Sequence, residues 1–255
     1  MQLTRRQFIK AAAAVPFAYY LPMVSTSTKR GIGLADLHVH YQDVNALCCS
    51  WFYDWSIRPI DLPGYIPLSE TGKDPGLQFD WLLLFNEPDN YTQTFVDPQT
   101  AAYRYSILAE KYDNSRLVVG GLNSAIQLRG GSWLPDFLEE VQRLETPVPL
   151  YWHLHGYVEL GLTVADIINW WTVCHDLTGG NYWISEFGDP SGNLDSYRLF
   201  LAWLDHTPWV TRYAAFANRL TGYEYYYPNH WPKPARMHLI DDSGRLTDLG
   251  RLYCG

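Results

Sequence analysis

Two glutamates lie where apolar runs of the chain are expected to end as buried strands. Glu87 follows the run 80–86, and Glu186 lies near the end of the run 181–187. A carboxylate at the end of a buried strand is costly unless it is solvated or paired. One such residue alone is most often a helix cap or a salt-bridge partner. Two together can cleave a glycosidic bond, because one protonates the leaving oxygen while the other attacks or activates water.

The two glutamates can meet only if the strands before them open on the same side of the fold. Short apolar runs predict eight strands, at 31–35, 47–53, 64–68, 80–86, 116–121, 150–155, 181–187 and 210–217. Helices are expected at about 97–112, 132–144, 163–177 and 195–204, and they are short or absent between the first three strands. This order predicts an α/β fold, a single (β/α)8 TIM barrel with short early connections, whose chemistry lies at the strand ends. A doubly wound open sheet is the alternative, but the chain has no glycine-rich phosphate loop.

Composition narrows the class of partner. The chain has 255 residues, of which 47% are hydrophobic and 18% charged, so it is expected to form one large globular domain. Its net charge of −8, without a basic stripe, argues against nucleic acid as a partner. The content of 11 Trp, 19 Tyr and 10 Phe is high. Some of these rings are expected to stack on neutral sugars and others to fill a Trp-rich core.

The first 28 residues resemble an export signal. Paired Arg5 and Arg6 precede Phe8 and Lys10, an apolar stretch covers 11–23, and Ser and Thr fill 25–28. This order is typical of a twin-arginine signal, which would take the protein to the periplasm, the cell surface or the medium. We therefore assign 1–28 to the signal segment and 29–255 to the barrel. A chance basic helix start and an uncleaved membrane anchor remain as alternatives.

The four cysteines do not suggest a metal site. Cys48, Cys49, Cys174 and Cys254 include no CxxC pair, which argues against zinc and thioredoxin-like chemistry. Adjacent Cys48 and Cys49 would bridge each other only with strain. We expect buried free thiols.

Six further segments, taken in order with the two glutamate motifs, resemble one family. The segments are KRG at 29–31, SWFYDW at 50–55, FNEPD at 85–89, WLPDFL at 133–138, HLHGY at 153–157, WISEFG at 183–188, RYAAF at 212–216 and LTDLGRLY at 246–253. Together they resemble the glycosyl hydrolase catalytic core proteins, also called alkali-sensitive-linkage-like and grouped as glycoside hydrolase family 128. The resemblance implies a retaining endo-hydrolase of β-1,3-glucan that uses no cofactor or metal. We expect it to act on a polysaccharide or oligosaccharide as a monomer, with no membrane partner beyond the export signal.

The same resemblance implies roles for individual residues. Glu87 would be the acid/base and Glu186 the nucleophile. Asn86 would bind the sugar 2-hydroxyl, while His155 and Tyr157 would orient the carboxylates or the sugar. The aromatic residues after the second strand would be stacking platforms or barrel-floor packing; they are Trp51, Tyr53 and Trp55.

Two positions depart from the family pattern. The eighth strand carries Ala215 where the family usually has a platform Trp, and the second carries Asp54 where the family often has Asn. The loop after the eighth strand is rich in aromatic residues, and one of them is expected to replace the platform: Tyr223, Tyr225, Tyr226, Tyr227 or Trp231. Among these, Trp231 is our candidate for substrate binding.

Two other functions fit parts of the sequence. His38 with His40, and His153 with His155, form two His-x-His pairs like those that bind metal in amidohydrolase barrels. That alternative leaves the two glutamate motifs without a role. A non-catalytic carbohydrate-binding barrel is the other alternative, and the presence of both carboxylates argues against it.

Overall fold

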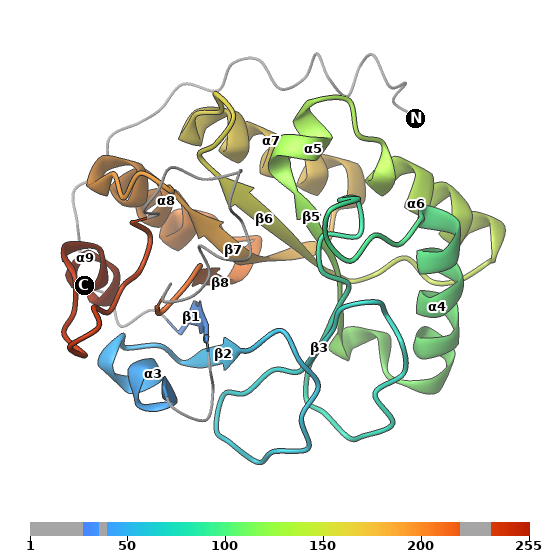
Figure 1. Cartoon of the computed structure of the whole chain (residues 1–255). Coiled ribbons are helices and arrows are strands. Elements are labelled where there is room, and N and C mark those ends of the chain that lie inside the picture. Colours follow the sequence, from blue (N-terminus) through green and yellow to red (C-terminus); the bar gives the residue numbers. More distant parts are fainter. Residues whose placement is uncertain (1–27, 36–39, 220–235) are drawn as a thin grey trace.

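Eight parallel strands form a barrel in the computed structural model, which describes residues 28–35, 40–219 and 236–255 (Figure 1). Their order around the barrel is β2-β1-β8-β7-β6-β5-β4-β3. A parallel bridge between Phe52 and Tyr65 continues the ring from β2 toward β3. The strands are β1 (Arg30–Gly33), β2 (Trp51–Tyr53), β3 (Leu68–Ser69), β4 (Leu82–Leu84), β5 (Leu117–Asn123), β6 (Tyr151–Tyr157), β7 (Asn181–Gly188) and β8 (Val210–Ala215). The prediction of a single (β/α)8 barrel is confirmed.

The four long helices begin where their capping residues predict. Asp97 accepts a hydrogen bond from the Thr100 N–H at the start of α4 (Pro98–Lys111). Thr163 and Asp166 form a capping box at the start of α7 (Val164–Thr178). The other two are α6 (Trp133–Arg143) and α8 (Leu194–His206). These helices surround the later strands of the barrel (Figure 1).

The early connections are short, as predicted. The only described helix between β1 and β4 is α3 (Gln42–Ala46). Sequence patterns missed three short elements: η1 (Asn114–Arg116), α5 (Ser124–Leu128) and α9 (Asp248–Cys254). Elements of one or two turns are too short to show a helical period.

A cluster of tryptophans around one arginine fills the barrel interior near the starts of the strands. The Arg212 guanidinium lies 4.5 Å from the ring centroid of Trp183 and 5.5 Å from that of Trp81. Trp51 completes the cluster, with its ring centroid 5.2 Å from that of Trp183. Such contacts stabilise a desolvated cation. Part of the aromatic excess therefore packs the barrel interior and does not face a ligand.

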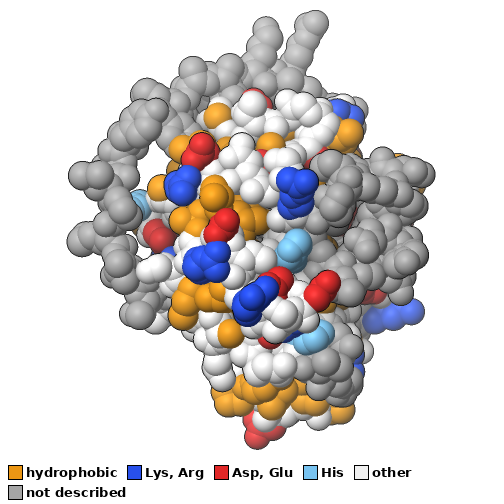
Figure 2. All heavy atoms as spheres, turned by 60° about the vertical axis from the view of Figure 1, so that its left-hand side comes forward, with side chains coloured by type: hydrophobic (Ala, Val, Ile, Leu, Met, Phe, Trp, Pro, Cys, Tyr) orange, Lys and Arg blue, Asp and Glu red, His pale blue; other side chains and the backbone are white. Residues whose placement is uncertain are grey.

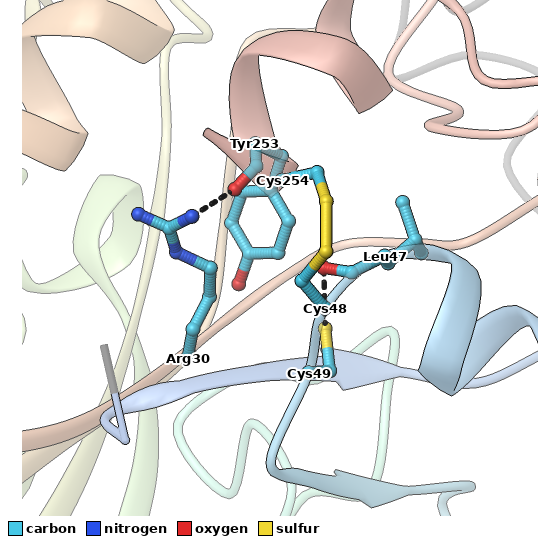
Figure 3. Close-up of a disulfide and its surroundings, with 6 residues drawn as sticks. All are labelled: Arg30, Leu47, Cys48, Cys49, Tyr253 and Cys254. Atoms are coloured by element: carbon cyan, nitrogen blue, oxygen red, sulfur yellow. Dashed lines mark hydrogen bonds between the residues drawn. A yellow bond between two sulfur atoms is a disulfide. The ribbon is translucent and has the colours of Figure 1, made fainter. Parts of the chain in front are cut away.

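A disulfide joins Cys48 to Cys254 and links the start of the barrel to its last helix, α9 (Figure 3). Beside it, Arg30 Nη1 donates to the Tyr253 carbonyl oxygen at 2.5 Å. The expectation of free thiols is therefore wrong for these two cysteines, while Cys49 and Cys174 are free. The pairing could not be predicted from spacing because 206 positions separate the two residues.

Charges of both signs are mixed on the face that carries α8 and α9 (Figure 2). Arg198 pairs with Asp195 on α8, and Arg251 pairs with Asp248 on α9. Within the described part of the chain, no helix is long and apolar enough to cross a membrane. The signal predicted for 1–28 lies almost entirely outside the described residues, so it remains a prediction.

Candidate active site

The two glutamates predicted from the strand ends meet at the mouth of the barrel. Glu87 follows β4 and Glu186 lies on β7, and both side chains are buried. One carboxylate oxygen of each, together with a ring nitrogen of His155, lies within 4.8 Å of the others. The fold therefore brings together two acids that are 99 positions apart in the chain.

Two β-bulges set the height of this cluster. Gly121 is an extra residue in β5 opposite β6, and Ser185 is an extra residue in β7 opposite β6. Beyond the bulges, Asn123, His155 and Glu186 stand in one row across three neighbouring strands. A bulge re-aims the side chains that follow it, which explains how neighbouring strands deliver three polar side chains to one level.

The bulge in β5 requires glycine. Gly120 and Gly121 have φ angles of 134° and 68°. A Cβ atom on Gly120 would lie 2.4 Å from the His153 carbonyl oxygen, and one on Gly121 would lie 3.0 Å from that of Phe85. The Gly121 carbonyl oxygen accepts a hydrogen bond from the Glu87 N–H at 2.9 Å. This contact helps hold Glu87 at a φ of 44°, a backbone conformation that is costly for residues other than glycine.

Glu186 is surrounded by hydrogen-bond donors. Trp55 Nε1 donates to Glu186 Oε1 at 2.8 Å, and the Tyr157 hydroxyl donates to Oε2. The Tyr53 hydroxyl lies 3.0 Å from Oε1 and 2.9 Å from the Ser185 carbonyl oxygen. These contacts lock the orientation of the carboxylate, as a nucleophile requires.

Glu87 is also held by donors, two of which sequence reasoning missed. Asn90 Nδ2 donates to Glu87 Oε2 at 2.6 Å, and Asn123 Nδ2 donates to Oε1 at 2.9 Å. His155 Nδ1 lies 3.4 Å from the same Oε1. The Asn123 amide is fixed at both ends, because its Oδ1 caps α5 by accepting from the Ala125 N–H. The one sequence signal for this role of Asn123 is its position at the end of a strand.

The acid/base role of Glu87 calls for a raised pKa, which burial and the nearby charge of Glu186 would supply, but the pKa of Glu87 is shifted the other way. Burial raises the pKa of its carboxyl, but the opposing contacts with His155, Asn90 and Asn123 are stronger together and leave the pKa below its ordinary value. The expectation considered burial and the charge of Glu186, and could not include donors that only the fold supplies. In the unliganded site, Glu87 is therefore ionised at neutral pH.

His155 lies between the two carboxylates. Its Nδ1 lies 3.4 Å from Glu87 Oε1 and 3.5 Å from Glu186 Oε2. Burial lowers the pKa of His155, but attraction to Glu186 and Glu87 outweighs burial and raises the pKa above its ordinary value. In its protonated form, His155 separates two acids that would otherwise repel each other.

His153 behaves in the opposite way and does not join the cluster. Its Nε2 donates to the Leu84 carbonyl oxygen at 2.9 Å, and its Nδ1 lies 2.8 Å from Ser185 Oγ. Burial and the charge of His155 lower the pKa of His153 to about 3, so the ring is neutral. Both ring nitrogens of His153 are engaged by these contacts, and the group of side chains that could hold a metal ion within the described chain includes Glu87, His155 and Glu186 but not His153. His38, the partner of His40 in the other His-x-His pair, lies outside the described residues.

The remaining predicted residues lie in different places. Asn86 is buried beside Glu87, and its Oδ1 has no hydrogen-bond partner within the described chain. Trp51 lies in the tryptophan cluster, only 1% exposed, where Nε1 donates to the Lys29 carbonyl oxygen. Trp51 is therefore a packing residue and not a sugar platform. Trp231 lies outside the described residues.

Ala215 on β8 is followed by an aromatic residue that packs against the site. Ala215 is fully buried, and the next residue, Phe216, packs edge-on against Trp55 and Tyr157 with ring centroids 5.4 and 5.8 Å apart. Phe216 thus contacts two of the three ring residues that hydrogen-bond to Glu186.

A match to a protein family agrees with this geometry. The model of the glycosyl hydrolase catalytic core matches residues 38–253. This range covers both glutamates and the ends of the seven strands β2 to β8. The chain belongs to the glycosyl hydrolase catalytic core family. The family resemblance inferred from the motifs is thereby confirmed, and the chain is a glycoside hydrolase by family.

Solved structures of glycoside hydrolase family 128 share the fold. An endo-β-1,3-glucanase of subgroup II from Pseudomonas viridiflava superposes with a TM-score of 0.69 and 22% identity, covering 90% of this chain and 98% of that one. A subgroup I endo-β-1,3-glucanase from Amycolatopsis mediterranei, in complex with laminaritriose, gives 0.65 and 19%, with coverage of 89% and 99%. A curdlan-specific exo-β-1,3-glucanase of subgroup III from Blastomyces gilchristii, in complex with glucose, gives 0.61 and 23%, with coverage of 88% and 97%. A search of curated proteins found no match.

Proposed function

We propose that this catalytic core cleaves internal bonds of β-1,3-glucan and retains the anomeric configuration. The observation that carries the proposal is the approach of the two carboxylates, with an oxygen of Glu87 and one of Glu186 within 4.8 Å. Retaining glycosidases place their carboxyl groups about 5–5.5 Å apart, whereas inverting enzymes leave about 6.5–9.5 Å for a water molecule. The short separation favours direct attack on the sugar by one carboxylate.

Glu186 is the nucleophile in this proposal. Its hydrogen bonds with Tyr53, Trp55 and Tyr157 fix its position. An oxygen of Glu186 attacks the anomeric carbon, the bond from that carbon to the leaving oxygen breaks, and a covalent glycosyl-enzyme forms. The leaving oxygen takes a proton from Glu87.

The proton that Glu87 delivers is held in the free enzyme by the Glu87–His155 pair. Because the two groups are in contact and strongly coupled, the proton belongs to the pair. It moves to Glu87 when bound substrate changes the electrostatic surroundings of the pair. Once the glycosyl-enzyme forms, Glu186 has lost its charge. Glu87 then takes a proton from water, which attacks the anomeric carbon from the face that the leaving group vacated, while the bond from that carbon to Glu186 breaks and Glu186 leaves as a carboxylate.

The choice of β-1,3-glucan rests on the relatives with the same fold. Two of those named above are endo-β-1,3-glucanases and one is an exo-β-1,3-glucanase. The buried Oδ1 of Asn86, next to Glu87, has no hydrogen-bond partner in the described chain, which supports a role as acceptor from a sugar hydroxyl. We assign it to the 2-hydroxyl of the reacting glucose.

A polysaccharide panel tests the proposal. Laminarin, cellulose, xylan and mannan are each incubated with the protein, the products are separated by size, and the anomer formed first is read by proton NMR. We expect a mixture of laminari-oligosaccharides from laminarin, with the β anomer appearing first. Glucose as the sole early product would indicate an exo-enzyme, and α anomer would indicate inversion. Lack of turnover on any glycan would favour the non-catalytic binding barrel.

We also propose that the protein is exported by its twin-arginine-like segment. The support is the order of Arg5, Arg6, Phe8 and Lys10 before an apolar stretch. Replacing both arginines by lysine should retain the protein in the cytoplasm of a bacterial host that has this export pathway. Unchanged export of that variant would contradict the proposal.

A further inference from the structure

An exposed pair of stacked aromatic rings lies on the loop that follows Glu87. Tyr91 is 82% exposed and Phe95 is 41% exposed, and their ring centroids are 4.2 Å apart at an interplanar angle of 19°. This loop connects β4 to α4, so it lies at the carboxyl end of the barrel strands, where substrates bind in this fold. It is drawn in teal and green in Figure 1.

The loop is held in place at its base. The Val96 N–H donates to the Pro88 carbonyl oxygen at 3.0 Å, which closes the loop, and the Val96 carbonyl oxygen accepts from Trp133 Nε1 at 2.8 Å. Trp133 belongs to α6 and is buried. The two exposed rings therefore stand on a backbone that is anchored to the helical layer.

Asn90 connects the ring pair to the catalytic carboxylate. Its Nδ2 donates to Glu87 Oε2 at 2.6 Å, and its Oδ1 accepts from the Thr92 N–H at 3.0 Å and from Thr92 Oγ1 at 2.8 Å. The residue next to it is Tyr91. One side chain thus fixes both the orientation of Glu87 and the course of the loop that carries the rings.

We propose that Tyr91 and Phe95 form a sugar-binding platform for the leaving-group side of a neutral β-glucan. This inference rests on the proposed function, because it uses Glu87 as the acid that protonates the leaving oxygen. The sugar released after that step lies against Glu87, and the chain continues from it toward the loop. The C–H faces of β-linked glucose carry a slight positive charge, which complements the electron-rich faces of aromatic rings.

The platform would act on binding and not on bond cleavage. Contacts made equally in the ground state and the transition state change KM and leave kcat almost unaltered. It would also act only when sugar is present on the leaving-group side. A substrate that has no sugar there should not sense the two rings.

Kinetics of Tyr91→Ala and Phe95→Ala, singly and together, test the platform. On laminarin, the double variant should show a KM raised on the order of fivefold or more, with kcat changed less than about twofold. On β-laminaribiosyl fluoride, whose leaving group is one fluorine atom, kcat/KM should match the parent enzyme. Tyr103→Ala is the matched control, since Tyr103 is 60% exposed but lies on α4, away from the loop.

The outcomes separate the platform from the proposed function. Unchanged KM on laminarin in the double variant, or an equal loss on the fluoride, overturns the platform and leaves the glucanase function intact. If the parent enzyme cleaves another β-glucan and not laminarin, the proposed linkage is wrong, and the same comparison on that glucan decides the platform. If nothing is cleaved, native gels containing each polysaccharide decide it: retardation that the double variant loses supports the platform, and no retardation of the parent protein overturns it.

Discussion

His155 Nδ1 lies 3.4 Å from Glu87 Oε1, so a buried imidazole and a buried carboxylate are in direct contact. The pKa of His155 is raised, because attraction to Glu186 and Glu87 exceeds the opposing effect of burial. A raised histidine pKa stabilises the fold fully below the ordinary pKa of 6.5, and this stabilisation is lost as pH rises through the folded value. His155 thus links the two catalytic candidates and makes their charge state depend on pH.

NMR titration of the imidazole rings measures this link. In the parent protein, His155 should remain protonated at pH values where an ordinary histidine is neutral. In Glu87→Gln its pKa should fall, because the variant removes both a hydrogen-bond acceptor and a negative charge. His153, with a pKa lowered to about 3, should stay neutral from pH 5 to 9 in both proteins and serves as an internal control. An unchanged His155 titration in Glu87→Gln would contradict the shared proton.

Azide rescue distinguishes the roles of the two glutamates. Glu87→Ala should retain activity on an aryl β-glycoside with a good leaving group, because that departure needs little protonation. Azide should then raise the rate and give a glycosyl azide of retained β configuration. Glu186→Ala should lose hydrolysis of every substrate, and azide could give only the inverted α product. Rescue of Glu87→Ala with inversion would reverse the assigned roles.

Trp55 and Trp51 should respond differently to replacement by phenylalanine. Trp55→Phe removes the donor 2.8 Å from Glu186 Oε1, and a hydrogen bond to a charged group contributes about 1.5–3 kcal/mol. We expect kcat/KM to fall about tenfold or more. Trp51→Phe opens space beside Trp183 in the barrel floor and should lower the unfolding midpoint with little change in kcat/KM. Equal kinetic losses in both variants would mean that the floor and the carboxylate are coupled.

Asp89 gives a second pH dependence, this time in stability. Burial first, and repulsion by Glu87 second, raise the pKa of Asp89 to about 7. Its favourable contribution is therefore complete below the ordinary value of 3.8 and is lost as pH rises through about 7. Between pH 5 and pH 8, the parent should lose about 2–3 kcal/mol of unfolding free energy relative to Asp89→Asn.

Denaturant unfolding at the two pH values measures this difference. Asp74→Asn is the control, because its contacts with Lys111 and Tyr112 lower the pKa of Asp74 to about 2 and keep it ionised throughout the range. A stability gap between the parent and Asp89→Asn that does not change with pH would show that Asp89 stays charged.

The Cys48–Cys254 disulfide should stabilise the barrel against unfolding. It closes a loop of 206 positions, and disulfides typically contribute about 2–4 kcal/mol by restricting the unfolded chain. Cys254→Ser should lower the unfolding midpoint, and a reducing agent should lower that of the parent protein to a similar value. The variant itself should be insensitive to the reductant. Sensitivity of both proteins would point to a different bond.

The sequence determined the elements of this protein and the identity of its main acids. Apolar runs marked all eight strands, and capping residues such as Asp97 and Thr163 marked the starts of helices, because both signals are local. The position of Glu87 and Glu186 at strand ends was enough to predict a shared site. The order of strands in a parallel barrel brings such ends to one rim.

Only the tertiary structure decided how the site is charged and which side chains support it. The bulges at Gly121 and Ser185 set the row of Asn123, His155 and Glu186, and a bulge depends on pairing with a neighbouring strand. The lowered pKa of Glu87 depends on donors from β5, β6 and its own loop, which no local pattern counts. The inward packing of Trp51 and the bond between Cys48 and Cys254 are decided in the same way. Burial and hydrogen bonding depend on all residues that lie close in space. The order of residues along the chain does not by itself identify those neighbours.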